Sequence, residues 1–242
     1  MASLYVKTDL DYAHQGEQIS LDGPELKHAV TVARVRQGER LMIGNGRGLL
    51  IDGVVVEVRP GVLTIEAERV QTVERPLHTI TLVQALAKGD RAELAIQAST
   101  ELGVDGIVPW AASRSVSKWE GPKISRGQQR WATIVREASK QSIRAWIPEV
   151  GELVTTAGIV SLASTHQIVV LEPTSHTALT SLSFDGRPLA LVVGPEGGIT
   201  SDESQMLVSA GAHSVCLGGN VLRTSTAGPA ALAALSVLLH RW

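Results

Sequence analysis

The sequence predicts an α/β protein built from two parts, a β-rich segment of residues 1–73 and a larger segment of residues 74–242. Two observations predict this division. In the first segment, short apolar runs are separated by turn dipeptides, among them Asn45-Gly46 and Pro60-Gly61. In the second segment, continuous apolar strands alternate with helical patterns, which is typical of a parallel sheet covered by helices on both faces.

The first segment is expected to form a small barrel-like module. A short helix is expected near Pro24, because the residues from Glu25 to Val30 have helical composition. Beyond it, apolar runs predict strands over residues 40–43, 49–58 and 62–70. Val73 to Pro76 read as a linker, because the proline ends the last strand and a second pattern begins.

The second segment is expected to alternate strands with helices. Its apolar runs predict strands over residues 79–84, 106–110, 167–171, 188–193 and 213–217. Helices are expected over residues 91–102, 124–144, 201–210 and 226–239. Gly103 and Gly211 follow two of these helices, as glycine commonly does at a helix end.

Composition narrows the classes of function. The apolar fraction of 44% is sufficient for a packed core, and the net charge of −2 carries no global basic signature. A nucleic-acid partner would therefore require positive charge concentrated on one face. The single cysteine, Cys216, excludes an internal disulfide and a cysteine zinc cage, and we expect no metal. Because neither a signal peptide nor a membrane-spanning apolar run is found, we expect a cytoplasmic protein.

The strongest local motif is a glycine-rich turn at residues 194–198, where an apolar strand runs directly into Gly-Pro-Glu-Gly-Gly. A helix follows, and Thr200 with Glu203 three residues later forms the pattern of a capping box. Glycines let backbone N–H groups approach a ligand closely, and ligands of open α/β sheets bind at the carboxyl ends of strands. Taken alone, the motif is better explained as a plain strand-to-helix turn.

A second glycine turn lies at Gly218-Gly219, after the strand that ends near Cys216. Thr224, Ser225 and Thr226 can each cap the helix that follows. Arg223 is a single cation between an apolar turn and an apolar helix. A surface ion pair would explain it, and so would a contact with a phosphate or a base.

Several common signatures are missing from the sequence. The glycines from Gly44 to Gly48 lack the spacing of a dinucleotide-binding loop, which disfavours a Rossmann-type oxidoreductase. A P-loop, an HExxH zinc motif and a GxSxG nucleophile elbow are also lacking. Cys216 lies in an apolar run, where a buried inert thiol is expected rather than a nucleophile.

At this point the residues carry a family resemblance. GPEGG with its capped helix, followed by LGxxVLRTxTA, is similar to the signature of the RsmE family of SPOUT RNA methyltransferases. Further segments resemble that family in order along the chain: HAVTVAR (28–34), QALAKGDR (84–91), ASTELGV (98–104), RSV (114–116), RW (130–131) and EASKQSIR (137–144). The departures from the pattern remove no charged or glycine motif residue; they are Ala33, Ala87, Ile143 and Gly228-Pro229.

The resemblance implies a fold and an activity. It implies a PUA-like, RNA-binding β-barrel over residues 1–73 and a SPOUT domain with a deep trefoil knot over residues 74–242. The implied reaction moves a methyl group from S-adenosylmethionine to N3 of a uridine in 16S ribosomal RNA of the small subunit, the m3U1498 type of modification. Alternatives are a SPOUT methyltransferase acting on another RNA such as tRNA, and a non-catalytic RNA-binding module. A homodimer is expected, with the apolar last helix at the subunit interface.

The resemblance also implies roles for individual residues. Arg223 would stabilise the negative charge that develops on the uracil carbonyls, or would hold a flanking phosphate. Glu196 is a candidate general base by position, and capping of backbone N–H groups at the turn is its alternative role. The cofactor would contact Leu171, Glu172, Gly194, Pro195, Glu196, Gly197, Gly198, Leu217, Gly218, Val221, Leu222 and Thr224. Candidate RNA contacts are Arg34, Arg36, Lys88, Arg91, Arg114 and Arg144, although each would also fit a solvated surface charge.

Overall fold

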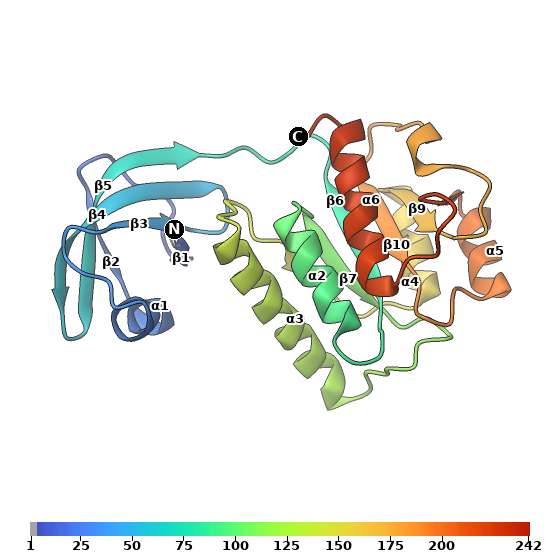
Figure 1. Ribbon diagram of the computed structural model, residues 1–242, viewed down its shortest axis with the longest axis horizontal. Helices are drawn as coiled ribbons and strands as arrows, with labels where there is room; N and C mark the ends of the chain where they lie inside the picture. Colours follow the sequence, from blue (N-terminus) through green and yellow to red (C-terminus); the bar gives the residue numbers. More distant parts are fainter. Residues whose placement is uncertain (1–3) are drawn as a thin grey trace. The chain divides into compact units, whose positions relative to one another are not determined.

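The computed structural model describes residues 4–242 and divides into two compact units (Figure 1). The first unit extends to Arg75 and also includes Ser139–Ile147. The second unit comprises Pro76–Ala138 and Pro148–Trp242. No helix within residues 4–242 is long and apolar enough to cross a membrane.

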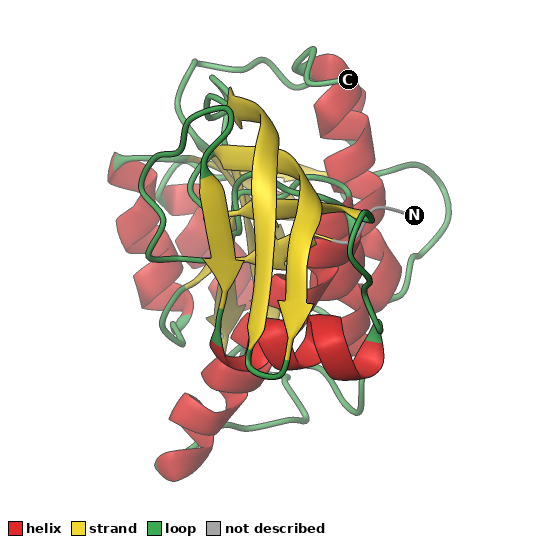
Figure 2. Cartoon of the chain, turned by 90° about the vertical axis from the view of Figure 1, so that its left-hand side faces the viewer, coloured by secondary structure: helices red, strands yellow, loops and turns green. Residues whose placement is uncertain are grey.

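The first unit is a curled five-stranded sheet with the order β1-β3-β4-β5-β2 (Figure 2). Among the strands that the structure describes in this unit, β1 and β3 pair in parallel and the other pairs are antiparallel. β4 and β5 form the long hairpin around Pro60-Gly61, and two register shifts, one with the extra residue in each strand, bend it, as β-bulges do. The strands are β1 (Leu4–Val6), β2 (Gln18–Leu21), β3 (Arg40–Gly44), β4 (Leu49–Arg59) and β5 (Val62–Thr72).

The three predicted strands of this unit and its short helix are confirmed. The helix α1 (Gly23–Lys27) continues as a π-helical turn, His28–Val32. β1 and β2 were not predicted, because runs of three and four residues are too short to establish an alternating pattern.

The segment Ser139–Ile147 joins the first unit through Trp146. The indole Nε1 of Trp146 donates a hydrogen bond to the Val73 carbonyl at 2.8 Å. The guanidinium of Arg75 lies 4.4 Å from the centre of the same ring, within the range of a cation–π contact. A Cβ on Gly48 would come within 2.7 Å of Trp146. The two units therefore cannot be separated at one position in the sequence, because the helix α3 (Pro122–Gln141) begins in the second unit and ends in the first.

The second unit contains the predicted parallel sheet, with six strands in the order β11-β9-β10-β6-β7-β8. Every pair is parallel, and all five residues of both β9 and β10 are buried, as in strands covered on both faces. The strands are β6 (Ile80–Ala85), β7 (Gly106–Trp110), β8 (Glu149–Val150), β9 (Gln167–Leu171), β10 (Leu189–Val193) and β11 (His213–Val215).

Helices cover both faces of this sheet (Figure 1). α2 packs against α6, and α4 packs against α5. The predicted helices are confirmed, whereas α4 was missed because six residues are too few for a helical period. Their bounds are α2 (Arg91–Glu101), α3 (Pro122–Gln141), α4 (Thr156–Ser161), α5 (Ser201–Ser209) and α6 (Thr224–Leu238).

Two bounds at the C-terminal end of the chain differ from the prediction. β11 ends at Val215 rather than at Leu217, and Cys216 forms an isolated β-bridge with Ala178. α6 begins at Thr224 rather than at Thr226. A Cβ on Gly228 would lie 3.2 Å from Cδ1 of Leu82, so the unusual glycine allows α6 to approach β6 closely.

Candidate functional site

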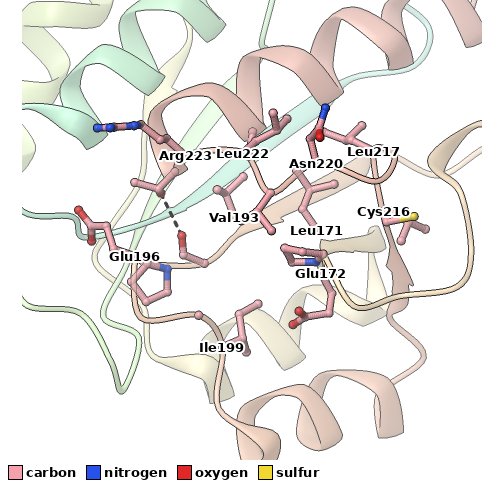
Figure 3. Close-up of a pocket in the computed structure, with 18 of the residues that line it drawn as sticks. Leu171, Glu172, Val193, Glu196, Ile199, Cys216, Leu217, Asn220, Leu222 and Arg223 are labelled. Atoms are coloured by element: carbon pink, nitrogen blue, oxygen red, sulfur yellow. Dashed lines mark hydrogen bonds between the residues drawn. The ribbon is translucent and has the colours of Figure 1, made fainter.

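A cavity of about 390 Å³ lies at the carboxyl ends of β9, β10 and β11 (Figure 3). In open α/β sheets this edge is where ligands bind. Both predicted glycine turns contribute to its wall. The lining residues are Arg91, Leu171, Glu172, Pro173, Val193, Gly194, Pro195, Glu196, Gly198, Ile199, Val215, Cys216, Leu217, Gly218, Asn220, Val221, Leu222, Arg223, Thr224 and Ala227.

The turn of residues 194–200 folds back tightly on itself after β10. A Cβ on Gly194 would lie only 2.7 Å from Cγ1 of Ile199, so no larger residue fits there without a shift. Gly198 has φ +74°, a left-handed conformation that favours glycine. Arg114 supports the turn from outside, because its Nη1 donates to the carbonyl of Gly197 at 3.0 Å.

Glu203 anchors the end of this turn. The predicted capping box is confirmed: the backbone N–H of Glu203 donates to the Thr200 hydroxyl at 3.2 Å, and Glu203 Oε2 accepts from the Thr200 N–H at 3.1 Å. Glu203 Oε1 also accepts from the backbone N–H of Ser113 and from the hydroxyl of Thr156, each at 2.9 Å. Burial raises the pKa of Glu203, but these hydrogen bonds outweigh burial and hold the pKa below its ordinary value.

The turn of residues 217–223 is tied down at its end by Thr224. The Thr224 hydroxyl donates to the Gly194 carbonyl at 2.9 Å, the dashed line in Figure 3. The same hydroxyl accepts from Nε2 of Gln84, which is fully buried at the end of β6. Thr224 was predicted as one of three possible helix caps, but Arg223 occupies the N-cap position and makes no side-chain cap bond. Thr224 instead joins the two glycine turns.

Charged side chains gather at one side of the cavity. Figure 3 shows the guanidinium of Arg223 and the carboxylate of Glu196 on the same side, away from Cys216. Arg223 is exposed, and no ion pair joins it to another residue in the part of the chain that the structure describes. Oε1 of Glu196 accepts from the Lys88 backbone N–H at 3.1 Å and from Arg91 Nη1 at 3.0 Å.

The Glu196 carboxylate is stabilised in its ionised form. Burial raises its pKa, but backbone hydrogen bonds and the Arg91 guanidinium outweigh burial and lower the pKa below its ordinary value. The backbone N–H groups that contact this carboxylate are its own, in the turn, and that of Lys88, in a neighbouring loop.

Comparison with known proteins agrees with this geometry. Residues 73–236 match the family described as "RNA methyltransferase domain", and residues 21–67 match the one described as "RNA methyltransferase PUA domain". A protein of Mycobacterium bovis named ribosomal RNA small subunit methyltransferase E is 41% identical over 92% of this chain and 87% of its own length.

The chain belongs to the ribosomal RNA small subunit methyltransferase E family. A solved member from Neisseria gonorrhoeae, bound to S-adenosyl methionine, superposes with a TM-score of 0.88 at 27% identity and covers 98% of both chains. A putative methyltransferase from Legionella pneumophila, also with bound S-adenosyl methionine, gives 0.85 at 28% identity over 98% of this chain and 97% of its own. The predicted family and the α/β fold with a PUA-like unit are confirmed.

The structure brings the predicted cofactor contacts of this methyltransferase E family member into one cavity, with a single exception. Gly197 belongs to the turn but does not line the cavity, since its α-carbon faces Arg114. Further lining residues were not predicted: Val193, Ile199, Val215, Cys216 and Ala227. Each lies within a few residues of a predicted contact, so extending the predicted segments along the strand ends would have found them.

The expectation that the Cys216 thiol is buried is wrong. Cys216 is partly exposed and lines the cavity. The reason is the early end of β11 at Val215, which leaves Cys216 outside the strand, in an isolated β-bridge with Ala178 beside the turn.

The six candidate RNA contacts are divided between the two units. Arg34, Arg36 and Arg144 belong to the first unit, and Arg34 adopts φ +54° just beyond the π-helical turn and its C-cap, Ala33. The remaining three belong to the second unit beside the cavity: Lys88, Arg91 and Arg114.

Proposed function

We propose that this chain transfers a methyl group from S-adenosylmethionine to N3 of a uridine in 16S ribosomal RNA of the small subunit, the m3U1498 type of modification. One observation carries the proposal: a cavity at the ends of three parallel strands, walled by two glycine turns, holds an exposed arginine that forms no ion pair within residues 4–242. Membership in the methyltransferase E family supports both the donor and the RNA.

The cavity residues fit S-adenosylmethionine. The volume lies within the range of about 300–1,000 Å³ that is usual for small-molecule sites. Leu171, Val193, Ile199 and Leu222 offer apolar surface to an adenine, and the glycine turns expose backbone groups to its polar edge. The carboxylate of Glu172 offers an acceptor for a hydroxyl or an ammonium group. The cofactor supplies the methyl group when bound.

Arg223 is the residue that we assign to the chemistry. Uridine N3 carries a proton at neutral pH, and its loss places negative charge on the adjacent carbonyl oxygens. A guanidinium that is not neutralised by a carboxylate can donate to those oxygens as the charge develops. Arg223 lines the cavity and has this freedom.

The RNA contacts proposed here extend over both units. Phosphates of the RNA can be neutralised by Arg34, Arg36 and Arg144 of the PUA-like unit and by Lys88, Arg91 and Arg114 of the second unit. RNA affinity should therefore fall as the salt concentration rises.

We also propose a trefoil knot at the two glycine turns, a cytoplasmic location and a homodimer. The dimer is supported by the exposed Val237 on α6, and sedimentation should give twice the 25.7 kDa chain mass.

The substrate is tested in a strain that lacks this gene. Mass spectrometry of its ribosomal and transfer RNA should find one methyluridine missing from 16S RNA, and the wild-type chain should restore it. Loss of a methyl group from tRNA with unchanged 16S RNA would favour the alternative substrate. If no RNA changes, the alternative of a non-catalytic RNA-binding module is favoured.

A further inference from the structure

The carboxylate of Glu196 joins two loops that are far apart in the sequence. Glu196 follows β10, whereas Lys88 lies in the loop after β6 and Arg91 is the first residue of α2, where that loop ends. β6 and β10 are neighbouring strands, so both loops lie at the same sheet edge. Oε1 alone accepts from both the Lys88 N–H and the Arg91 guanidinium.

These contacts suit an anchor better than a general base. A base needs a pKa near the working pH and a lone pair that faces the proton. The Glu196 side chain is 24% exposed, and the oxygen that carries its hydrogen bonds is occupied by groups of the protein. The proton to be removed, in contrast, belongs to the substrate.

Arg91 has the freedom to contact a substrate. It lines the cavity, and its side chain is 39% exposed. A guanidinium carries five N–H donors, and only the bond from Nη1 to Glu196 is found for it within residues 4–242. The remaining donors are available to a phosphate or a carbonyl oxygen, while the bond to Glu196 limits the orientations of the planar group.

We infer that Glu196 is a positioning residue, whose carboxylate holds the guanidinium of Arg91 at the cavity wall so that Arg91 binds the RNA beside the methylated base. This inference rests on the proposed function. It assigns to Glu196 an effect on RNA affinity that passes through Arg91, and no direct part in proton removal.

The chain offers a matched control on the same helix. Glu93 lies two residues after Arg91 on α2 and forms an ion pair with Arg130 of α3. Neither Glu93 nor Arg130 lines the cavity. Replacing Glu93 therefore removes an ion-paired carboxylate from the helix that begins with Arg91, at a position outside the cavity.

The test is a double-mutant cycle of Glu196→Ala and Arg91→Ala, with small ribosomal subunits from the deletion strain as substrate. We expect Glu196→Ala to raise KM for the subunits about tenfold while kcat stays within about threefold of wild type. In the Arg91→Ala background, removing Glu196 should change KM by less than about twofold, because the two side chains act as one unit. Glu196→Gln keeps an oxygen that accepts both hydrogen bonds and should recover most of the affinity, and Glu93→Ala should match wild type.

Three results would overturn the inference. A collapse of kcat in both Glu196→Gln and Glu196→Ala would identify a general base. Weaker S-adenosylmethionine binding by Glu196→Ala in calorimetry would assign the side chain to the cofactor. Independent, additive effects of Glu196→Ala and Arg91→Ala would separate the two residues. The RNA affinities of the same variants are also measured by filter binding, which needs no methyl transfer and therefore tests the inference by itself. Methyl transfer to the subunits by the wild-type chain tests the proposed function separately.

Discussion

The two glycine turns of the cavity are built in different ways. The turn of residues 194–200 is braced by the protein, through Ile199, Arg114 and the buried carboxylate of Glu203. In the turn of residues 217–223, a Cβ on Gly218 or Gly219 would meet no atom within 4 Å. Within residues 4–242, none of the N–H groups of residues 217–222 donates a hydrogen bond to the protein.

This difference indicates that the two turns contribute differently to the stability of the fold and to the activity of the site. The braced turn forms with the core of the second unit, so the residues that brace it should contribute mainly to stability. The open turn has unused backbone donors and carries Arg223, so its residues should contribute mainly to binding and chemistry. Mutations of the brace and of the open turn should therefore separate stability from activity.

The largest effect is expected from the open turn. Arg223→Ala should lower methyl transfer by at least about 100-fold, because a positioned donor to a developing negative charge is worth about 3 kcal/mol. The free energy of unfolding should change by about 0.5 kcal/mol or less, since an exposed and unpaired cation contributes little. Arg223→Lys should recover little activity, because an ammonium lacks the planar fork. Near wild-type transfer by Arg223→Ala at saturating RNA would remove this residue from the chemistry.

The braced turn should respond in the opposite sense. Glu203→Ala leaves the donors of Ser113, Thr156 and Thr200 without their acceptor in a buried place, and should lower the free energy of unfolding by about 3 kcal/mol. Urea denaturation measures this loss. Asp202→Ala, an exposed carboxylate one residue earlier, is the control and should cost less than about 1 kcal/mol. Equal losses in both variants would mean that the brace is not specific.

A smaller effect is expected from pH. Because the pKa of Glu203 is lower in the folded chain than in the unfolded one, its ionised form stabilises the fold. That contribution is complete above the ordinary pKa of a glutamate, about 4.3, and is lost as the pH falls through the lower folded value. The difference in unfolding free energy between wild type and Glu203→Gln should therefore be largest at neutral pH and should narrow in acid. A constant difference would show that Glu203 does not titrate differently in the two states.

Much of the fold could be predicted from the sequence, because long apolar runs and helical periods are local signals. β9 and β7 match their predicted ranges, whereas the two residues of β8 carry no pattern. The capping box of Thr200 and Glu203 was also predictable, since its spacing is local. The other partners of Glu203 lie 90 and 47 residues away, and only the folded chain brings them together.

The segments that form the candidate site could be predicted from the sequence, whereas the contacts between those segments could not. Family motifs placed both glycine turns at strand ends, where parallel strands converge. The bond from Arg91 to Glu196 spans 105 residues, so it could not be read from spacing. Cys216 was misjudged because two residues decide whether it ends a strand or starts a turn.

Hydrogen exchange with and without S-adenosylmethionine tests the contrast between the turns most directly. Amides of residues 217–222 should exchange rapidly in the free protein, and saturating cofactor should slow them by about tenfold or more. The amides of Gly198 and Thr200, which already donate to Pro195 and Glu203, should change much less. Unchanged exchange at residues 217–222, under conditions in which calorimetry detects cofactor binding, would contradict the account.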